Sequence, residues 1–159
     1  MFRVSARQAT PEDVSSLATL YRLLEDEMTP LSRLWPLADG LAEPVEDAIH
    51  ALVEDPDAVV MVGEIDAVAV GFLAARIEQM LPQAEGELIG SIRLVFVHQP
   101  AREVGVGEAM LDAALVEMRR RGVHTFDAHV LPGHRLVKNF FESGGFKARS
   151  IVMSRYEDA

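Results

Sequence analysis

The chain has no cysteine among its 159 residues. Disulfide bonds, thiolate metal ligands and a cysteine nucleophile are therefore excluded, and we expect no metal site. Positive charge is also scarce, because 15 Lys and Arg residues face 25 Asp and Glu residues, for a formal net charge of −10. Since nucleic-acid binding relies on Lys and Arg contacts to phosphate, we expect no nucleic acid as the main partner. Amines would suit such a surface, although solubility explains the same charge more simply.

Long apolar runs are missing as well. Residues 1–7 lack the apolar core of a secretory signal, and the most apolar long stretch, residues 58–75, is interrupted by Glu64 and Asp66. This stretch is too polar to span a bilayer. We therefore expect a cytoplasmic protein with no membrane partner. The length of the chain predicts a single domain over residues 1–159.

The rest of the chain is organised around one stretch, residues 94–110. It begins with the apolar run Leu-Val-Phe-Val, which is typical of a strand buried on both faces, and continues through Gly105 and Gly107 into a helical pattern. The first N–H groups of a helix have no internal partner and lie at the positive end of its dipole, so they can bind an anion. Neither the nucleoside-triphosphate loop nor the dinucleotide fingerprint matches here. The stretch favours another phosphate ligand, while an ordinary glycine turn remains the alternative.

Periodicity predicts the other elements. Alternating or continuous apolar runs indicate strands at 2–8, 58–63, 67–77, 87–97, 123–131 and 146–156. Helical spacing indicates helices at 10–24, 44–54, 107–121 and 134–143. The predicted order is therefore β-α-α-β-β-β-α-β-α-β, an α/β arrangement.

Two motifs at the right separation resemble those of one family. Arg102-x-x-Gly105-x-Gly107 resembles the pyrophosphate loop [QR]-x-x-G-x-[GA] of the GNAT superfamily of N-acetyltransferases. The second family pattern, N-x-x-A-x-x-[FL]-Y-x-x-x-G-F, keeps its spacing from His134 to Phe146, with His134 replacing the asparagine and Phe141 replacing the tyrosine. The order of elements agrees over nearly the whole chain. The resemblance implies the GNAT-type α/β (α+β) fold, a mixed central sheet flanked by helices.

The resemblance further implies that acetyl-CoA, or another acyl-CoA, is the cosubstrate. In this family a bulge separates the cofactor strand from the next strand, the pantetheine arm pairs with the cofactor strand, and the loop wraps the pyrophosphate. Arg102 would contact phosphate or form a surface salt bridge. The implied cofactor-binding residues are Val95, Phe96, Val97, Arg102, Glu103, Val104, Gly105, Val106, Gly107, Glu108, His134 and Phe141.

Three residues are candidates for the general base that deprotonates the amine. His129 stands where some family members have a catalytic glutamate, Glu87 lies on the strand before the loop, and His98 directly precedes the loop. A histidine that only forms a structural hydrogen bond is the alternative for His129. The usual acid is missing, because Phe141 has no proton to donate, so the proton would come through water or transfer would be slow or absent.

The implied activity is direct transfer of an acetyl group from acetyl-CoA to a primary amine of a small molecule or a peptide. The alternative is an acyl-CoA-binding regulatory or catalytically weak protein with the same fold. The acceptor is not identified by the sequence. Residues 31–41, which include Trp35, would form either a pocket wall or core and dimer contacts. A homodimer is therefore left open.

Overall fold

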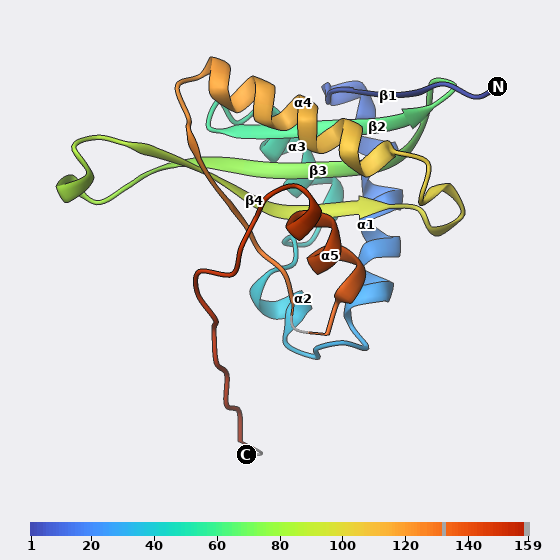
Figure 1. Cartoon of the computed structure of the whole chain (residues 1–159). Helices are drawn as coiled ribbons and strands as arrows, with labels where there is room; N and C mark the ends of the chain where they lie inside the picture. The colour runs from blue at the N-terminus through green and yellow to red at the C-terminus, as the bar shows by residue number, and fades with distance from the viewer. Residues whose placement is uncertain (132, 158–159) are drawn as a thin grey trace.

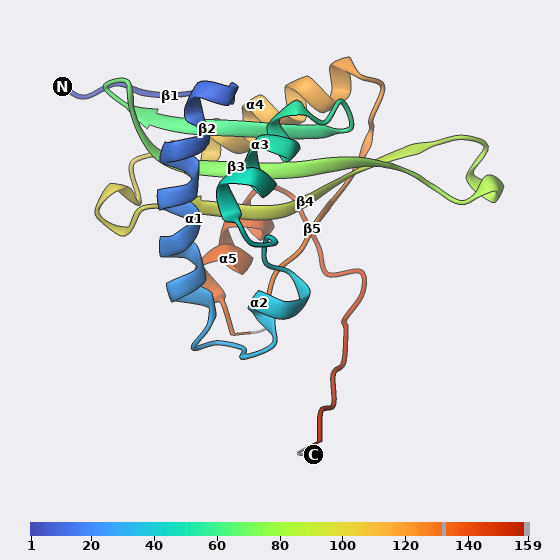
Figure 2. The same ribbon diagram turned by 180° about the vertical axis from the view of Figure 1, so that it is seen from behind.

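The computed structural model describes residues 1–131 and 133–157, which form a five-stranded sheet with helices on both faces (Figures 1 and 2). The strands are β1 (Val4–Gln8), β2 (Ala58–Ile65), β3 (Val68–Gln79), β4 (Leu88–Val97) and β5 (Thr125–Ala128). The α-helices are α1 (Val14–Met28), α2 (Trp35–Ala38), α3 (Val45–Glu54), α4 (Val106–Arg120) and α5 (Arg135–Ser143). No helix in these two ranges is both long and apolar enough to cross a membrane.

The sheet is mixed. Its strands follow chain order from β1 to β5, and neighbours are antiparallel except for β4 and β5, which are parallel. Figure 1 shows α4 in front of the sheet, and Figure 2, seen from the opposite side, shows α1 and α3 in front of the other face. The expected α/β class and its mixed, helix-flanked sheet are confirmed.

Each face of the sheet carries its own apolar core. One cluster joins α1 and α3 to the sheet, and the other joins α4 and Phe141 of α5 to the opposite face. Trp35 lies in the first cluster with 5% exposure and stacks on Tyr21, with 6.2 Å between ring centroids. Of the two roles expected for residues 31–41, Trp35 therefore serves the core.

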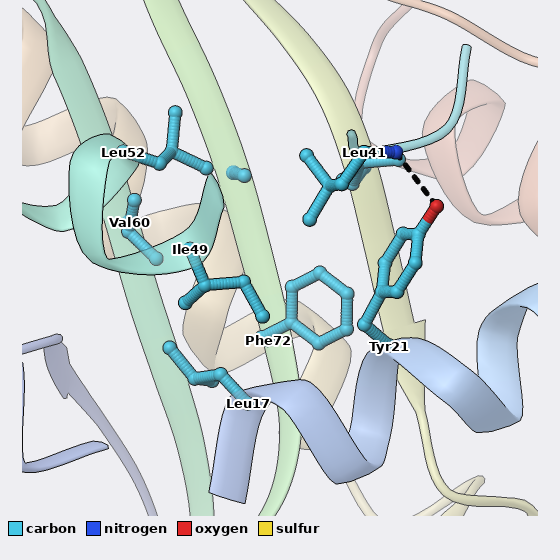
Figure 3. Close-up of a pocket in the computed structure, with 9 residues that line it drawn as sticks. Leu17, Tyr21, Leu41, Ile49, Leu52, Val60 and Phe72 are labelled. Carbon is cyan, nitrogen blue, oxygen red and sulfur yellow. Dashed lines mark hydrogen bonds between the residues drawn. The ribbon is translucent and has the colours of Figure 1, made fainter. Parts of the chain in front are cut away.

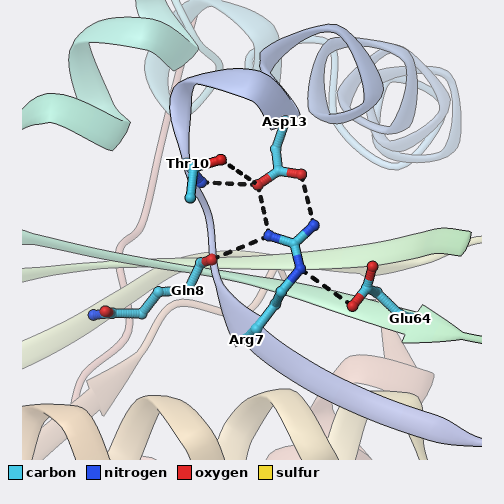
Figure 4. A network of polar contacts seen from close by, with 5 residues as sticks. All are labelled: Arg7, Gln8, Thr10, Asp13 and Glu64. Carbon is cyan, nitrogen blue, oxygen red and sulfur yellow. Dashed lines mark hydrogen bonds and ion pairs between the residues drawn. The ribbon is translucent and has the colours of Figure 1, made fainter. Parts of the chain in front are cut away.

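A polar network fixes the passage from β1 into α1 (Figure 4). The Asp13 carboxylate accepts two hydrogen bonds from the Arg7 guanidinium, at 2.8 and 2.7 Å, and one from the Thr10 backbone N–H at 2.8 Å. Arg7 also donates to Glu64 of β2 at 3.2 Å. The Arg7 hydrogen bond is the main reason that the pKa of Asp13 is lowered from its ordinary value. The network therefore ties the first strand, the second strand and the start of α1 together.

The expected strand over residues 146–156 is wrong. These residues form no strand, and every side chain from 147 to 157 is exposed. A strand requires a hydrogen-bonded neighbour, and an apolar pattern in sequence does not say whether one is available. β5 is also shorter than the expected 123–131, because its ladder with β4 ends where the two strands separate.

Candidate functional site

The loop between β4 and α4 ends in a row of free backbone donors. Gly105 has φ +95° and precedes α4, and a Cβ atom built on it meets no atom within 4 Å. The N–H groups from Val104 to Glu108 donate no hydrogen bond to any residue that the structure describes, whereas Ala109 N–H donates to the Gly105 carbonyl at 3.0 Å. Free donors at the positive end of a 15-residue helix can bind an anion.

The second glycine serves packing between helices. A Cβ atom on Gly107 would lie 3.0 Å from Cε1 of Phe140 in α5. The absence of a side chain thus allows α5 to lie against the start of α4. Phe141, the next residue, is 3% exposed, and its ring makes edge contacts with Phe140 and Phe146 at centroid distances of 5.1 and 5.2 Å. The structure places Phe141 inside the core and Phe140 beside the loop.

The edge of β4 opens next to this loop. β4 pairs with β5 only over Ile89 to Ile92, and the last backbone bond joins His129 N–H to the Ile92 carbonyl at 3.0 Å. On its other side, pairing with β3 shifts register so that Ala74 faces Leu94 and Ala75 faces Ile92, which leaves Arg93 as the bulged residue. The expected bulge is therefore present in this strand.

Beyond the bulge, residues 93–97 have no strand beside them on the β5 side in the part of the chain that the structure describes. Val95 and Val97 are half-buried, and Phe96 is buried. An open strand edge of this kind can pair with an extended ligand through its main chain. The open edge leads directly towards the free N–H groups of the loop.

Arg102 is held by protein groups. Its Nε donates to the Val97 carbonyl at 2.7 Å, and its two terminal nitrogens donate to the Glu27 carboxylate at 2.9 and 3.0 Å. Glu27 lies near the end of α1, so this contact joins the other face of the sheet to the end of β4. We call Arg102, Glu27 and the Val97 carbonyl the arginine clamp. Of the two expected roles for Arg102, these contacts fit the salt bridge.

His129 lies where β5 separates from β4. Its Nε2 is 3.0 Å from Oγ of Ser91, a β4 residue that is 3% exposed. Partial removal from water lowers the pKa of His129 from its ordinary value, the positive charge of Arg93 lowers it further, and Asp127 opposes the shift. The imidazole is therefore mainly neutral at neutral pH, the form that can accept a proton.

The other expected site residues are spread more widely. His98 is exposed just after β4, and its N–H donates to the Val70 carbonyl at 2.8 Å. Glu87 is exposed in the turn between β3 and β4, at the opposite end of β4 from the loop. His134 precedes α5 and is half-buried, and its pKa is lowered by this burial, with Glu27 opposing and Arg102 adding to the shift. The structure thus brings His134, but not Glu87, near the arginine clamp.

Two residues of the site were missed from the sequence. Glu27 is 75 positions from Arg102, and nothing in its local pattern distinguishes it from other acids on α1. Ser91 could have been noticed, because it is the one hydroxyl residue within an otherwise apolar segment of β4, Ile89–Ile92.

A small apolar cavity lies on the opposite face of the sheet (Figure 3). It is lined by nine residues, among them Leu17, Ile49 and Phe72. The hydroxyl of Tyr21 beside it accepts a hydrogen bond from the Leu41 N–H at 2.7 Å. Tyr21 is fully buried there, so this tyrosine cannot supply a proton at the β4–α4 loop.

Comparisons with known proteins match both the sequence and the fold of the chain. The family model described as acetyltransferase (GNAT) family matches residues 17–146. Among curated proteins, no sequence matches the chain.

Solved structures share the fold at low sequence identity. A tetramutant of the BH1408 protein from Bacillus halodurans has a TM-score of 0.80 and 18% identity, over 96% of this chain and 99% of that chain. The aminoglycoside N-acetyltransferase AAC(6')-Iy in complex with CoA has a TM-score of 0.74 and 17% identity, over 100% and 97% of the two chains. The aminoglycoside acetyltransferase meta-AAC0020, from an uncultured soil metagenomic sample, has a TM-score of 0.74 and 15% identity, over 98% of this chain and 96% of that chain.

Proposed function

Because the chain belongs to the acetyltransferase (GNAT) family, we propose that it transfers an acetyl group from acetyl-CoA directly to a primary amine of a small molecule or a peptide. The observation that carries this proposal is the row of free N–H groups from Val104 to Glu108 beside the open edge of β4. Such a pair of features suits a ligand with an anionic group at one end and an extended amide arm at the other.

We assign the pyrophosphate to the backbone donors of the loop and the pantetheine arm to the edge formed by Val95, Phe96 and Val97. The open space at Gly105 supports this fit, because no atom lies within 4 Å of where a side chain would begin. Arg102 stays bound within the arginine clamp and is not assigned to the pyrophosphate. When bound, acetyl-CoA supplies the activated thioester that an amine can attack.

His129 is proposed as the general base. When its Nε2 carries the proton and donates to Ser91 Oγ, its Nδ1 is free to accept a proton from an ammonium group. The buried Ser91 hydroxyl then holds the ring in one orientation. The lowered pKa of His129 keeps its imidazole neutral, so the ring can accept a proton when the amine is deprotonated.

The loop assignment is tested by adding a negative charge beside the backbone donors. Val104 is 39% exposed, so Val104→Asp places a carboxylate at the loop without disturbing the core. We expect roughly fivefold to tenfold weaker CoA binding by calorimetry, since a charge pair near a protein surface is worth about 1 kcal/mol or more. Gly107 is unsuitable for this purpose, because its substitution would also displace Phe140.

Val116→Asp is the matched control. Val116 is 62% exposed and belongs to the same helix, about 15 Å from its start at 1.5 Å per residue. CoA affinity should stay unchanged in this variant. Equal affinities for the wild type and Val104→Asp would remove the loop from the proposal.

A second function is favoured by one specific observation, the burial of Phe141. The position lacks the family's usual hydroxyl, Tyr21 is enclosed on the other face, and Tyr156 lies in the exposed C-terminal segment. The alternative is therefore an acyl-CoA-binding protein with a regulatory role or weak catalysis. Release of free CoA thiol from acetyl-CoA in the presence of a panel of amines distinguishes the two, because only an enzyme accelerates it.

A further inference from the structure

The main-chain groups at the open edge of β4 have a definite order. His98 N–H donates to the Val70 carbonyl at 2.8 Å, so the N–H of residue 98 points towards β3. The main chain of successive strand residues points to alternate sides, and the groups of Val97 and Val95 therefore point to the open edge. In residues 1–131 and 133–157, no loop, turn or side-chain bond involves either of these N–H groups or the Val95 carbonyl.

The Val97 carbonyl differs from these free groups, because the arginine clamp covers it. Arg102 Nε donates to this oxygen at 2.7 Å, while Glu27 holds the other two guanidinium nitrogens at 2.9 and 3.0 Å. A carbonyl oxygen has a second lone pair. However, the guanidinium charge beside it disfavours the approach of another N–H group, since both carry positive charge towards the oxygen.

The edge therefore offers an extended ligand one free acceptor. Next to the loop, Val97 presents only its N–H, whereas Val95 presents both its N–H and its carbonyl. An amide N–H in the arm of a ligand can then pair with Val95 alone, which defines a single register. With the Val97 carbonyl uncovered, a second and similar register would lie two residues away, a displacement of about 7 Å along the strand.

We propose that Arg102 is a positioning residue that sets the register of the acyl-CoA arm on β4, an inference that rests on the proposed acetyl transfer. By covering the Val97 carbonyl, Arg102 directs the arm to the Val95 carbonyl. The acyl end of the ligand is then held on the side of the edge where β5 and His129 lie. Arg102 acts through the main chain of β4 and touches no reacting atom. Glu27 of α1 keeps its guanidinium in place.

The first test observes the bound thioester without turnover. Acetyl-CoA carrying ¹³C at the thioester carbonyl is bound to the wild type and to Arg102→Met, well below the Tm of either protein. Isotope-edited infrared difference spectra then report the carbonyl stretch. We expect one narrow band for the wild type and two bands, or one clearly broadened band, for Arg102→Met. CoA affinity should change less than about threefold, because the arm keeps as many hydrogen bonds in the second register.

Two further variants separate register from stability in the same spectra. Glu27→Gln loses part of the ion pair but leaves the bond from Arg102 to Val97, so it should keep one narrow band. Arg22→Met, which removes an exposed ion pair with Glu43 on the same helix, should also keep one band. Broadening in Glu27→Gln equal to that in Arg102→Met would show that loss of the ion pair alone is responsible, and would overturn the proposal.

The second test is kinetic. Arg102→Met should lower kcat about 100-fold at an unchanged KM for acetyl-CoA, because even a misplacement of about 1 Å can cost this much. Arg102→Lys keeps a cationic donor for the Val97 carbonyl and should recover at least about tenfold of the loss. An unchanged kcat in Arg102→Met, or a loss confined to KM, would contradict the register role.

The spectra also separate this inference from the proposed function. One narrow band in the wild type and a broadened band in Arg102→Met, without turnover of any amine, would support the register and remove the acetyltransferase. Turnover in the wild type with identical bands in the two proteins would remove the register and leave the acetyltransferase. A wild type that binds no acetyl-CoA would overturn both.

Discussion

Arg102 gives the sharpest prediction, because its two expected roles, a salt bridge in the arginine clamp and a contact to phosphate, have different consequences. Replacing Arg102 by Met removes the two hydrogen bonds to Glu27 and the one to the Val97 carbonyl. The side chains of Arg102 and Glu27 are 23% and 30% exposed, so the lost bonds are only partly replaced by water. Three partly buried, charge-assisted bonds should together contribute about 2 kcal/mol to the free energy of unfolding.

For a chain of 159 residues this corresponds to a Tm lowered by about 4–8 °C, measured by calorimetry. Glu27→Gln should lower Tm by about half as much, because Arg102 keeps its bond to Val97. In a double-mutant cycle the two changes should be non-additive, since both remove the same pair of bonds. CoA affinity, measured well below Tm, should change less than about threefold in either variant.

Arg22→Met is the matched control. Arg22 lies on the same helix as Glu27 and also forms a two-bond ion pair, with Glu43, but the two side chains are 45% and 66% exposed. Its loss should leave Tm unchanged within error. The reasoning would be refuted if Arg102→Met kept the wild-type Tm and weakened CoA binding tenfold or more. Arg102 would then serve the phosphate.

Three further predictions concern the proposed base, the missing acid and the first polar network. The rate of acetyl transfer should rise with pH along an acid limb whose midpoint lies below 6.5, because the pKa of His129 is lowered. His129→Gln should remove this limb with unchanged CoA affinity, and a limb that persists would exclude the residue. Phe141→Tyr should raise the turnover rate if a missing acid limits it, whereas Phe140→Tyr, beside Gly107, serves as the comparison for an added hydroxyl. Asp13→Asn should lower the free energy of unfolding at pH 7 by about 1–2 kcal/mol, measured by urea unfolding. Because the pKa of Asp13 is lowered in the folded state, its contribution is present above about pH 4 and is lost as pH falls through the folded pKa, so the variant should show a weaker loss of stability in acid.

The central part of the fold could be predicted from the sequence because its signals are local. The expected strand over 87–97 and helix over 107–121 agree with Leu88–Val97 and Val106–Arg120 to within one residue. An apolar run, two glycines and a helical period fix these elements without knowledge of distant residues.

What could not be predicted depends on contacts between distant residues. The bond between Arg102 and Glu27 joins positions 75 apart, and the sequence therefore left the arginine between two roles. The motif spacing places Phe141 at the position of the family's tyrosine, but only the packing of α5 on α4 shows that its ring is buried. The prediction of a last strand is wrong for a related reason. Residues 146–156 have a strand-like pattern, yet pairing also requires a neighbour in space.

The separation of β4 and β5 after Ile92 bears on the kinetic order of the proposed reaction. A sheet that is split at this point can be approached from two sides, so a donor on the open edge of β4 and an amine near His129 need not displace each other. Because the proposed transfer is direct, with no acyl group carried by the protein, both substrates must be present together before the group moves. Initial rates measured at several fixed amine concentrations should then give intersecting double-reciprocal lines, whereas parallel lines would indicate that an acylated protein is released from the first half of the cycle.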